Sequence, residues 1–66
     1  MAHVRFTLEN NAQVFTEVKE SVEDVAFDIQ RQYEFKGMVK LVTADGDVTL
    51  LSSDNIAAVE ITKAVL

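Results

Sequence analysis

The chain has 66 residues and a mass of 7.3 kDa, and its 48% apolar and 26% charged residues are the composition of an ordinary globular domain. It contains no cysteine, which excludes disulfide and thiolate-metal scaffolds, and no apolar run approaches the roughly 18 residues that span a bilayer. The formal charge of −5 has the wrong sign for a sequence-independent grip on nucleic acid or anionic lipid. We therefore expect one cytoplasmic domain over residues 1–66.

The N-terminal residues predict a β-hairpin. Apolar and polar residues alternate over residues 3–9 and again over residues 14–19, and Asn10 and Asn11 between them favour a turn. A three-residue loop that also includes Ala12 is expected, because it keeps nearly all of one face apolar. The expected cross-strand pairs are Leu8 with Val14, Phe6 with Thr16 and Val4 with Val18.

One helix is predicted after the hairpin. Ser21 followed by Asp24 resembles a capping box, and apolar residues then recur at helical spacing. Phe27 breaks this pattern, because it projects about 150° from the centre of the apolar face, beside Glu23 and Arg31. We therefore expect Phe27 to be exposed. The apolar face consists of Val22, Val25, Ala26, Ile29 and Tyr33.

Three more strands are predicted in the rest of the chain. Residues 35–43 alternate, and Asp45-Gly46 favours a two-residue type I′ turn into a strand over residues 48–52. A short turn then leads to a last strand over residues 57–63, with a weakly ordered end at Val65 and Leu66. The type I′ turn would place Val39, Leu41, Val48 and Leu50 on one face of the second hairpin, and Met38, Val42 and Leu51 on the other.

Together these elements predict an α+β fold, with a β-hairpin, one α-helix and then three strands. We expect a mostly antiparallel, five-stranded sheet with the helix packed on one face. One helix covers only one face, so Met38, Val42 and Leu51 would form an apolar patch on the other. A second copy of the chain is the simplest cover, since a chain this short buries only about 60% of its unfolded surface. Alternatively, the final strand or the Val65–Leu66 tail covers the patch.

No residue pattern points to catalysis or to a bound cofactor. The one histidine, His3, lies close to the N-terminus without the nucleophile and orienting group that a catalytic triad needs. Asp45-Gly46-Asp47 lacks the twelve-residue spacing of a calcium loop, and the glycines lie too far apart for a phosphate-binding loop. We predict no enzyme activity, no catalytic or metal-binding residue and no cofactor.

The outer side of the predicted helix is the candidate surface for a protein partner. Phe27 would act there as an apolar anchor, surrounded by charged residues of both signs. Acidic residues dominate at the start of the helix, where they also complement the helix dipole. The predicted surface consists of Glu20, Glu23, Asp24, Phe27, Asp28 and Arg31.

We therefore predict a homodimeric protein-interaction module and leave two alternatives open, an acidic decoy or inhibitor that binds a nucleic-acid-binding protein and a small ligand- or RNA-binding domain. The acidic residues would suit a decoy that occupies a nucleic-acid-binding protein. An RNA-binding platform needs exposed aromatic rings beside basic residues, and the negative charge of the chain disfavours it. The residues that come nearest to this pattern are Tyr33, Phe35, Lys36 and Lys40. A small-ligand site would need a pocket between helix and sheet, a space that we expect Phe6, Ile29 and Leu41 to fill.

The segment from Asp45 to Ile61, DGDVTLLSSDNIAAVEI, resembles the tail of several small acidic bacterial and phage proteins of unknown function. The similarity covers about a quarter of the chain and consists of a hairpin arm, a turn and an Ile-x-x-Val-Glu strand. It implies a bacterial or phage source, and it implies no activity, cofactor or catalytic residue.

Overall fold

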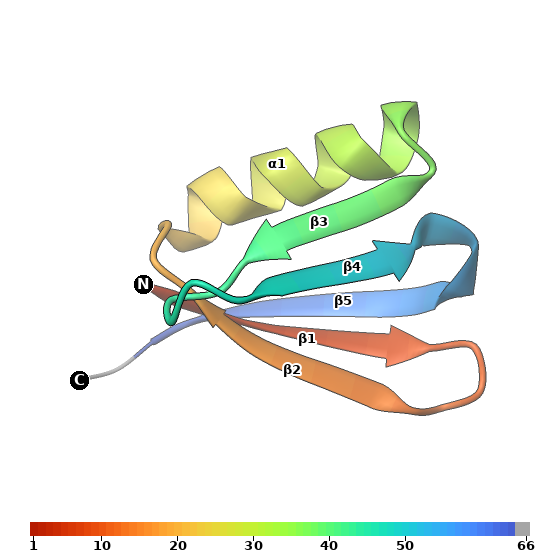
Figure 1. Cartoon of the computed structure of the whole chain (residues 1–66), viewed down its shortest axis with the longest axis horizontal. Coiled ribbons are helices and arrows are strands. Elements are labelled where there is room, and N and C mark those ends of the chain that lie inside the picture. The colour runs from red at the N-terminus through yellow and green to blue at the C-terminus, as the bar shows by residue number, and fades with distance from the viewer. Residues whose placement is uncertain (65–66) are drawn as a thin grey trace.

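The computed structural model describes residues 1–64 and has the predicted α+β order of a hairpin, a helix and three further strands (Figure 1). The helix packs against antiparallel sheet, as expected. Val65 and Leu66, predicted to be weakly ordered or to cover the patch, lie outside the described residues. The elements are β1 (Ala2–Leu8), β2 (Gln13–Val18), α1 (Val22–Phe35), β3 (Met38–Val42), β4 (Val48–Ser52), the 3-10 turn η1 (Ser53–Asn55) and β5 (Ile56–Lys63).

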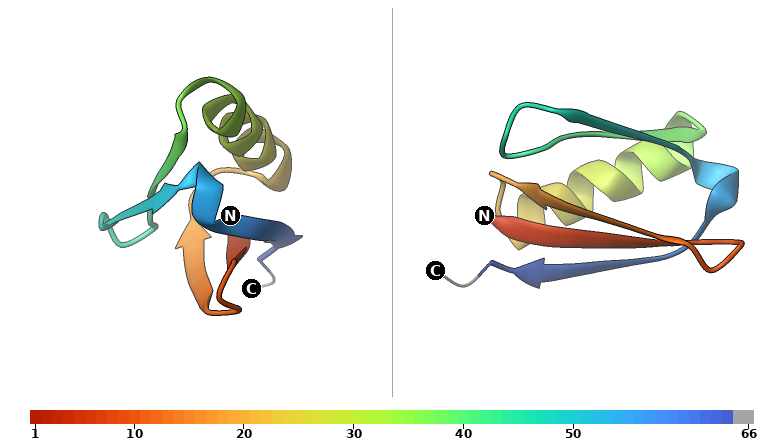
Figure 2. Two further views of the ribbon diagram at one scale, coloured as in Figure 1. Left: turned by 90° about the vertical axis from the view of Figure 1, so that its right-hand side faces the viewer. Right: turned by 60° about the horizontal axis from the view of Figure 1, so that its bottom comes forward.

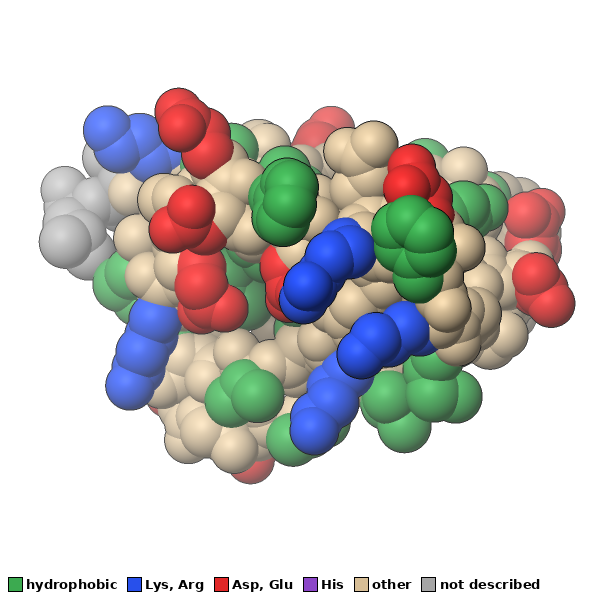
Figure 3. Space-filling view, turned by 90° about the horizontal axis from the view of Figure 1, so that it is seen from above, with side chains coloured by type: hydrophobic (Ala, Val, Ile, Leu, Met, Phe, Trp, Pro, Cys, Tyr) green, Lys and Arg blue, Asp and Glu red, His purple; other side chains and the backbone are tan. Residues whose placement is uncertain are grey.

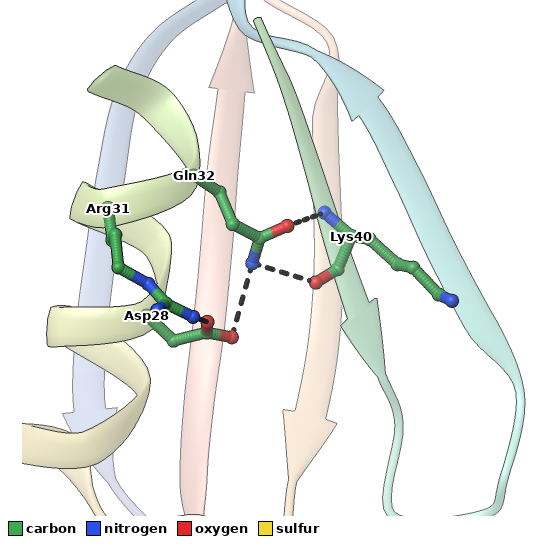
Figure 4. A network of polar contacts seen from close by, with 4 residues as sticks. All are labelled: Asp28, Arg31, Gln32 and Lys40. Atoms are coloured by element: carbon green, nitrogen blue, oxygen red, sulfur yellow. Dashed lines mark hydrogen bonds and ion pairs between the residues drawn. The ribbon is translucent and has the colours of Figure 1, made fainter. Parts of the chain in front are cut away.

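The five strands form two antiparallel sheets, so the prediction of one five-stranded sheet is wrong. One sheet has the order β2-β1-β5, and the other consists of β3 and β4. The two sheets meet where the backbone N–H of Ala44 donates to the carbonyl oxygen of Glu17 at 2.7 Å. On the edge of β3 that does not face β4, the Gln32 side chain forms hydrogen bonds with the backbone of Lys40 (Figure 4).

The core lies between α1 and the inner faces of the two sheets. The helix begins at the predicted cap, where the hydroxyl oxygen of Ser21 accepts from the backbone N–H of Asp24 at 3.2 Å. Of the predicted apolar face, Val25 and Ile29 are buried and Val22 packs against the core, whereas Tyr33 is 52% exposed. The buried apolar residues are Ala2, Val4, Phe6, Val18, Val25, Ile29, Val39, Leu41 and Ile56.

The first hairpin has a three-residue loop, as predicted, but the loop lies one residue earlier in the chain. The backbone N–H of Leu8 donates to Ala12 O at 2.8 Å, and the N–H of Asn11 donates to Leu8 O at 2.9 Å. Asn11 adopts a left-handed φ of 68°, which closes this type of loop and which asparagine tolerates. The predicted pairing is therefore wrong by two residues, a shift that keeps every side chain on its expected face. The observed pairs include Phe6 with Val14, Val4 with Thr16 and Ala2 with Val18.

The second hairpin has the same kind of loop, formed by Ala44, Asp45 and Gly46, in place of the predicted two-residue turn. The N–H of Gly46 donates to Thr43 O at 2.9 Å, and the N–H of Thr43 donates to Asp47 O at 2.7 Å. Gly46 has a φ of 92°, the left-handed region that favours glycine. The extra loop residue shifts β4 by one position, which turns each of its side chains to the opposite face. The observed pairs include Val39 with Leu51, Lys40 with Leu50 and Val42 with Val48.

Thr16 carries a buried hydroxyl that the described residues leave without a hydrogen-bond partner. The residue is 6% exposed and lies opposite Val4 on the core face of β2. We expect Thr16→Val to raise the free energy of unfolding by about 1 kcal/mol, because it removes a desolvated polar group and keeps the branched shape. Denaturant unfolding measures this change. Thr62→Val, at an exposed position of β5, is the control, and a loss of stability in Thr16→Val would contradict the prediction.

Candidate functional site

The exposed large apolar side chains include two groups that lie on different elements. One group lies on the outer side of α1 and contains Phe27 and Phe35. The other lies on the second hairpin, on the side turned away from the core. Each group is a candidate contact surface, because contiguous apolar side chains in water are typical of binding sites.

The hairpin group, which we name the hairpin face, consists of Met38, Val42, Val48 and Leu50. These four side chains are between 45% and 57% exposed. Met38 and Val42 therefore lie where the sequence predicts an interface, but Leu51 does not, because it is half-buried and packs against the core. The one-residue shift of β4 explains this correction: it turns Leu51 inward and turns Val48 and Leu50, which were predicted to lie on the core side, outward.

The hairpin face adjoins an open strand edge. The backbone N–H of Ser53 donates to Gly37 O at 3.1 Å, and antiparallel pairs alternate in the direction of their backbone groups. Val48, Leu50 and Ser52 therefore direct their N–H and C=O groups away from β3. β4 lies at the border of the molecule (Figure 2), and its sequence, VTLLS, contains no charge. Natural proteins usually protect such an edge with charged residues, so an unprotected edge is available for pairing.

The outer side of α1 carries charges of both signs around Phe27, which is 70% exposed, as predicted. Glu23 and Asp24 lie in the first turn of the helix. Toward the other end, Phe27, Arg31 and Phe35 line a hollow of about 230 Å³ together with two polar residues. Figure 3 shows acidic side chains gathered over the N-terminal end of α1, and basic side chains beside apolar groups toward its C-terminal end.

The structure places most of the predicted partner surface in the open, but not Asp28. Glu20, Glu23 and Arg31 are exposed, whereas Asp28 is half-buried. Its carboxylate Oδ2 accepts from Nε2 of Gln32 at 3.1 Å, on the side of α1 that faces β3. Asp28 therefore supports the helix–strand contact more than it offers a contact to a partner.

Gln32 joins α1 to β3 and was missed by the sequence reasoning. Its side-chain Nε2 donates to Lys40 O at 3.0 Å, and its Oε1 accepts from the backbone N–H of Lys40 at 2.7 Å (Figure 4). Gln32 is 9% exposed, so its carboxamide substitutes for a neighbouring strand along this part of β3. The available signal was its position three residues after Ile29, which places it toward the buried side of the helix.

A shallow groove of about 360 Å³ lies between α1 and β5. Its lining includes Ile29, Tyr33, Val59 and Ile61, and is apolar apart from two polar helix residues. This groove offers packing more than acid–base chemistry. The side chains expected to fill the space between helix and sheet, Phe6, Ile29 and Leu41, are all buried, but Ile29 also lines this groove.

The polar groups on the outer face of the three-stranded sheet form a small contact without a nucleophile in it. Nε2 of His3 lies 2.7 Å from the Glu17 carboxylate, and the His3 and Phe15 ring centroids are 5.4 Å apart. These side chains are half-exposed or exposed, so they do not form an enclosed site. In the part of the chain that the structure describes, no group of three or more His, Asp or Glu side chains is placed to hold a metal ion.

The comparisons with known proteins gave no match, either among protein-family models or among curated proteins. Over residues 1–64, no helix combines the length and the apolar character that crossing a membrane requires. The hairpin face and the outer side of α1 are therefore the candidate contact surfaces of the described residues.

Proposed function

We propose that this protein is a small non-enzymatic interaction module that works as a homodimer in the cytoplasm, with a second copy that pairs along the edge of β4 beside the hairpin face. The observation that carries the proposal is the group of four half-exposed apolar side chains beside the open, uncharged edge of β4. Burying apolar side chains stabilises an association by roughly 25 cal/mol for each Å² removed from water. A chain of this length buries little surface by itself, so a second copy adds core that it lacks.

A two-fold axis at Leu50 brings together the unpaired backbone groups of β4 from the two copies and also their Leu50 side chains. Under this symmetry, β4 pairs antiparallel with β4 of the second copy, and Leu50 lies opposite its own equivalent. Val48 then lies opposite Ser52 of the other copy. The two hairpins form one four-stranded sheet in which the two hairpin faces lie side by side, and Leu50 contacts its own equivalent across the new strand pair.

The final strand, which was the alternative cover for the apolar patch, does not cover the hairpin face in residues 1–64, and the Val65–Leu66 tail lies outside the described residues. The final strand, β5, pairs with β1 in the other sheet, and the hairpin face stays exposed in residues 1–64. A second copy paired along β4 is therefore the partner that we propose for this part of the molecule.

Light scattering on a size-exclusion column tests this proposal. We expect twice the chain mass of 7.3 kDa to persist in about 0.5 M NaCl, because salt screens charges but not apolar and backbone contacts. Leu50→Lys is expected to give a monomer at that salt concentration. Thr62→Lys adds the same charge at an exposed position of β5 and is expected to leave the dimer intact. A wild-type monomer in high salt, or a dimer that Leu50→Lys leaves unchanged, would refute the proposal.

A further inference from the structure

Three residues on the outer side of α1 form a stripe with an acidic residue at one end, an aromatic residue in the middle and a basic residue at the other end. Glu23, Phe27 and Arg31 are spaced by four residues, so they lie one above the other along the helix. All three are exposed. We name them the α1 stripe. An acid and a base lie at equal distances from a central aromatic residue, so a second stripe in the reverse direction complements the first.

We infer that the α1 stripe of one molecule docks antiparallel on the α1 stripe of a second copy, with a two-fold axis at Phe27. Each Glu23 then faces Arg31 of the other copy, and the symmetry forms this pair twice. The two Phe27 rings meet at the axis. This contact goes beyond the homodimer proposed above, because it uses different residues and forms whether or not the hairpin face is covered.

Charge complementarity selects the second copy and its direction. Within residues 1–64, Glu23 forms no ion pair, and Arg31 lies 3.8 Å from Asp28 with 60% of its side chain exposed. Both groups can therefore turn toward a partner. A parallel arrangement would place Glu23 against Glu23 and Arg31 against Arg31, which repel each other. The antiparallel arrangement replaces both repulsions by attractions.

The surface around Phe27 has room for the aromatic side chain of a second copy. Phe27 and Phe35 line the hollow of about 230 Å³, with Arg31 between them along the helix. Aromatic rings pair best when they are offset or tilted, and a hollow beside each ring permits such an offset. Figure 3 shows that this side of α1 is open in the single chain.

Exchanging the charges of the stripe tests its register. Glu23→Arg and Arg31→Glu each place like charges opposite each other, so we expect each variant to weaken self-association at least about tenfold in about 0.05 M NaCl. A one-to-one mixture of the two variants places opposite charges at both contacts again. So does the double variant Glu23→Arg/Arg31→Glu, and we expect both samples to regain the wild-type association. Sedimentation equilibrium at low and high salt measures these constants.

One further variant matches the charge change of Glu23→Arg away from the helix. Glu9→Arg is expected to leave the association constant within about twofold of the wild type, since Glu9 is exposed and lies in the loop between β1 and β2. Phe27→Ala is expected to weaken association at least about tenfold while the circular dichroism melt stays unchanged, because the ring is exposed in the single chain.

The outcomes separate this contact from the dimer at the hairpin face. An association step that disappears between low and high salt, and that follows the charge exchange, belongs to the α1 stripe. A dimer that persists in high salt and is lost in Leu50→Lys belongs to the hairpin face. The inference is overturned if low salt produces no such step, if both single reversals associate like the wild type, or if neither the mixture nor the double variant regains association.

Discussion

Replacing Gln32 with leucine is expected to lower the free energy of unfolding by about 2–4 kcal/mol, although leucine is of similar size and more apolar. The substitution removes three hydrogen bonds, two to the backbone of Lys40 and one to Asp28. The backbone groups of Lys40 and the carboxylate of Asp28 then lack these hydrogen bonds at a partly buried site, and each unsatisfied group costs about 1–3 kcal/mol. Urea unfolding followed by circular dichroism measures the change.

Gln30→Leu, the same substitution two residues earlier in the chain, is the control. Gln30 is exposed and donates from Nε2 to Glu34 at 3.3 Å on the surface of the helix. Gln30→Leu is therefore expected to change the free energy of unfolding by less than about 0.5 kcal/mol. Equal effects of the two substitutions would show that Gln32 acts through helix propensity and not through its contact with β3.

The order of helix and strands was predictable because each element carries its own local pattern. Alternation of period two marks the strands, and apolar residues at helical spacing mark α1. The helix start was predictable from Ser21 and Asp24, because a hydroxyl at that position has a backbone N–H within reach. Phe27 was predictable as an exposed residue, since helix geometry alone separates it from the apolar side.

The hairpin registers were not predictable, because a turn sequence allows more than one loop length. Asp45-Gly46 fits a two-residue turn and also a three-residue loop with glycine in the last, left-handed position. The choice matters most in the second hairpin, where both faces of β4 carry large apolar residues. The pattern of β4 therefore gives no penalty for a one-residue shift, and Leu51 was placed on the wrong face.

The contact between α1 and β3 depends on side-chain hydrogen bonds that no local sequence pattern marks. Glutamine is a common residue on the surface of a helix, and nothing near Gln32 in the chain indicates that Lys40 is its partner. Only the packed structure brings the side chain of one to the backbone of the other. The register of the second hairpin decides which residues of β4 belong to the hairpin face, so the patch was predictable in kind but not in all its members.

Replacing Phe6 with alanine is expected to lower the free energy of unfolding by about 3–5 kcal/mol. Phe6 is 0% exposed and is the largest of the fully buried side chains, so alanine leaves a cavity in the middle of the core. The total stability of a domain of this size is roughly 3–10 kcal/mol, and we therefore expect a substantial unfolded fraction at room temperature. Circular dichroism and urea unfolding measure both quantities.

Phe27→Ala is the matched control, because it removes the same side chain from the surface of the same molecule. Measured dilute and in high salt, where the α1 stripe is expected to be uncovered, it should change the free energy of unfolding by less than about 0.5 kcal/mol, since alanine also favours the helix. A large loss of stability would show that Phe27 belongs to the core and has no free ring to offer. A small loss of stability in Phe6→Ala would instead mean that the core closes around the space of the missing ring. We expect β1 to resist this movement, because it is paired on one side with β2 and on the other with β5.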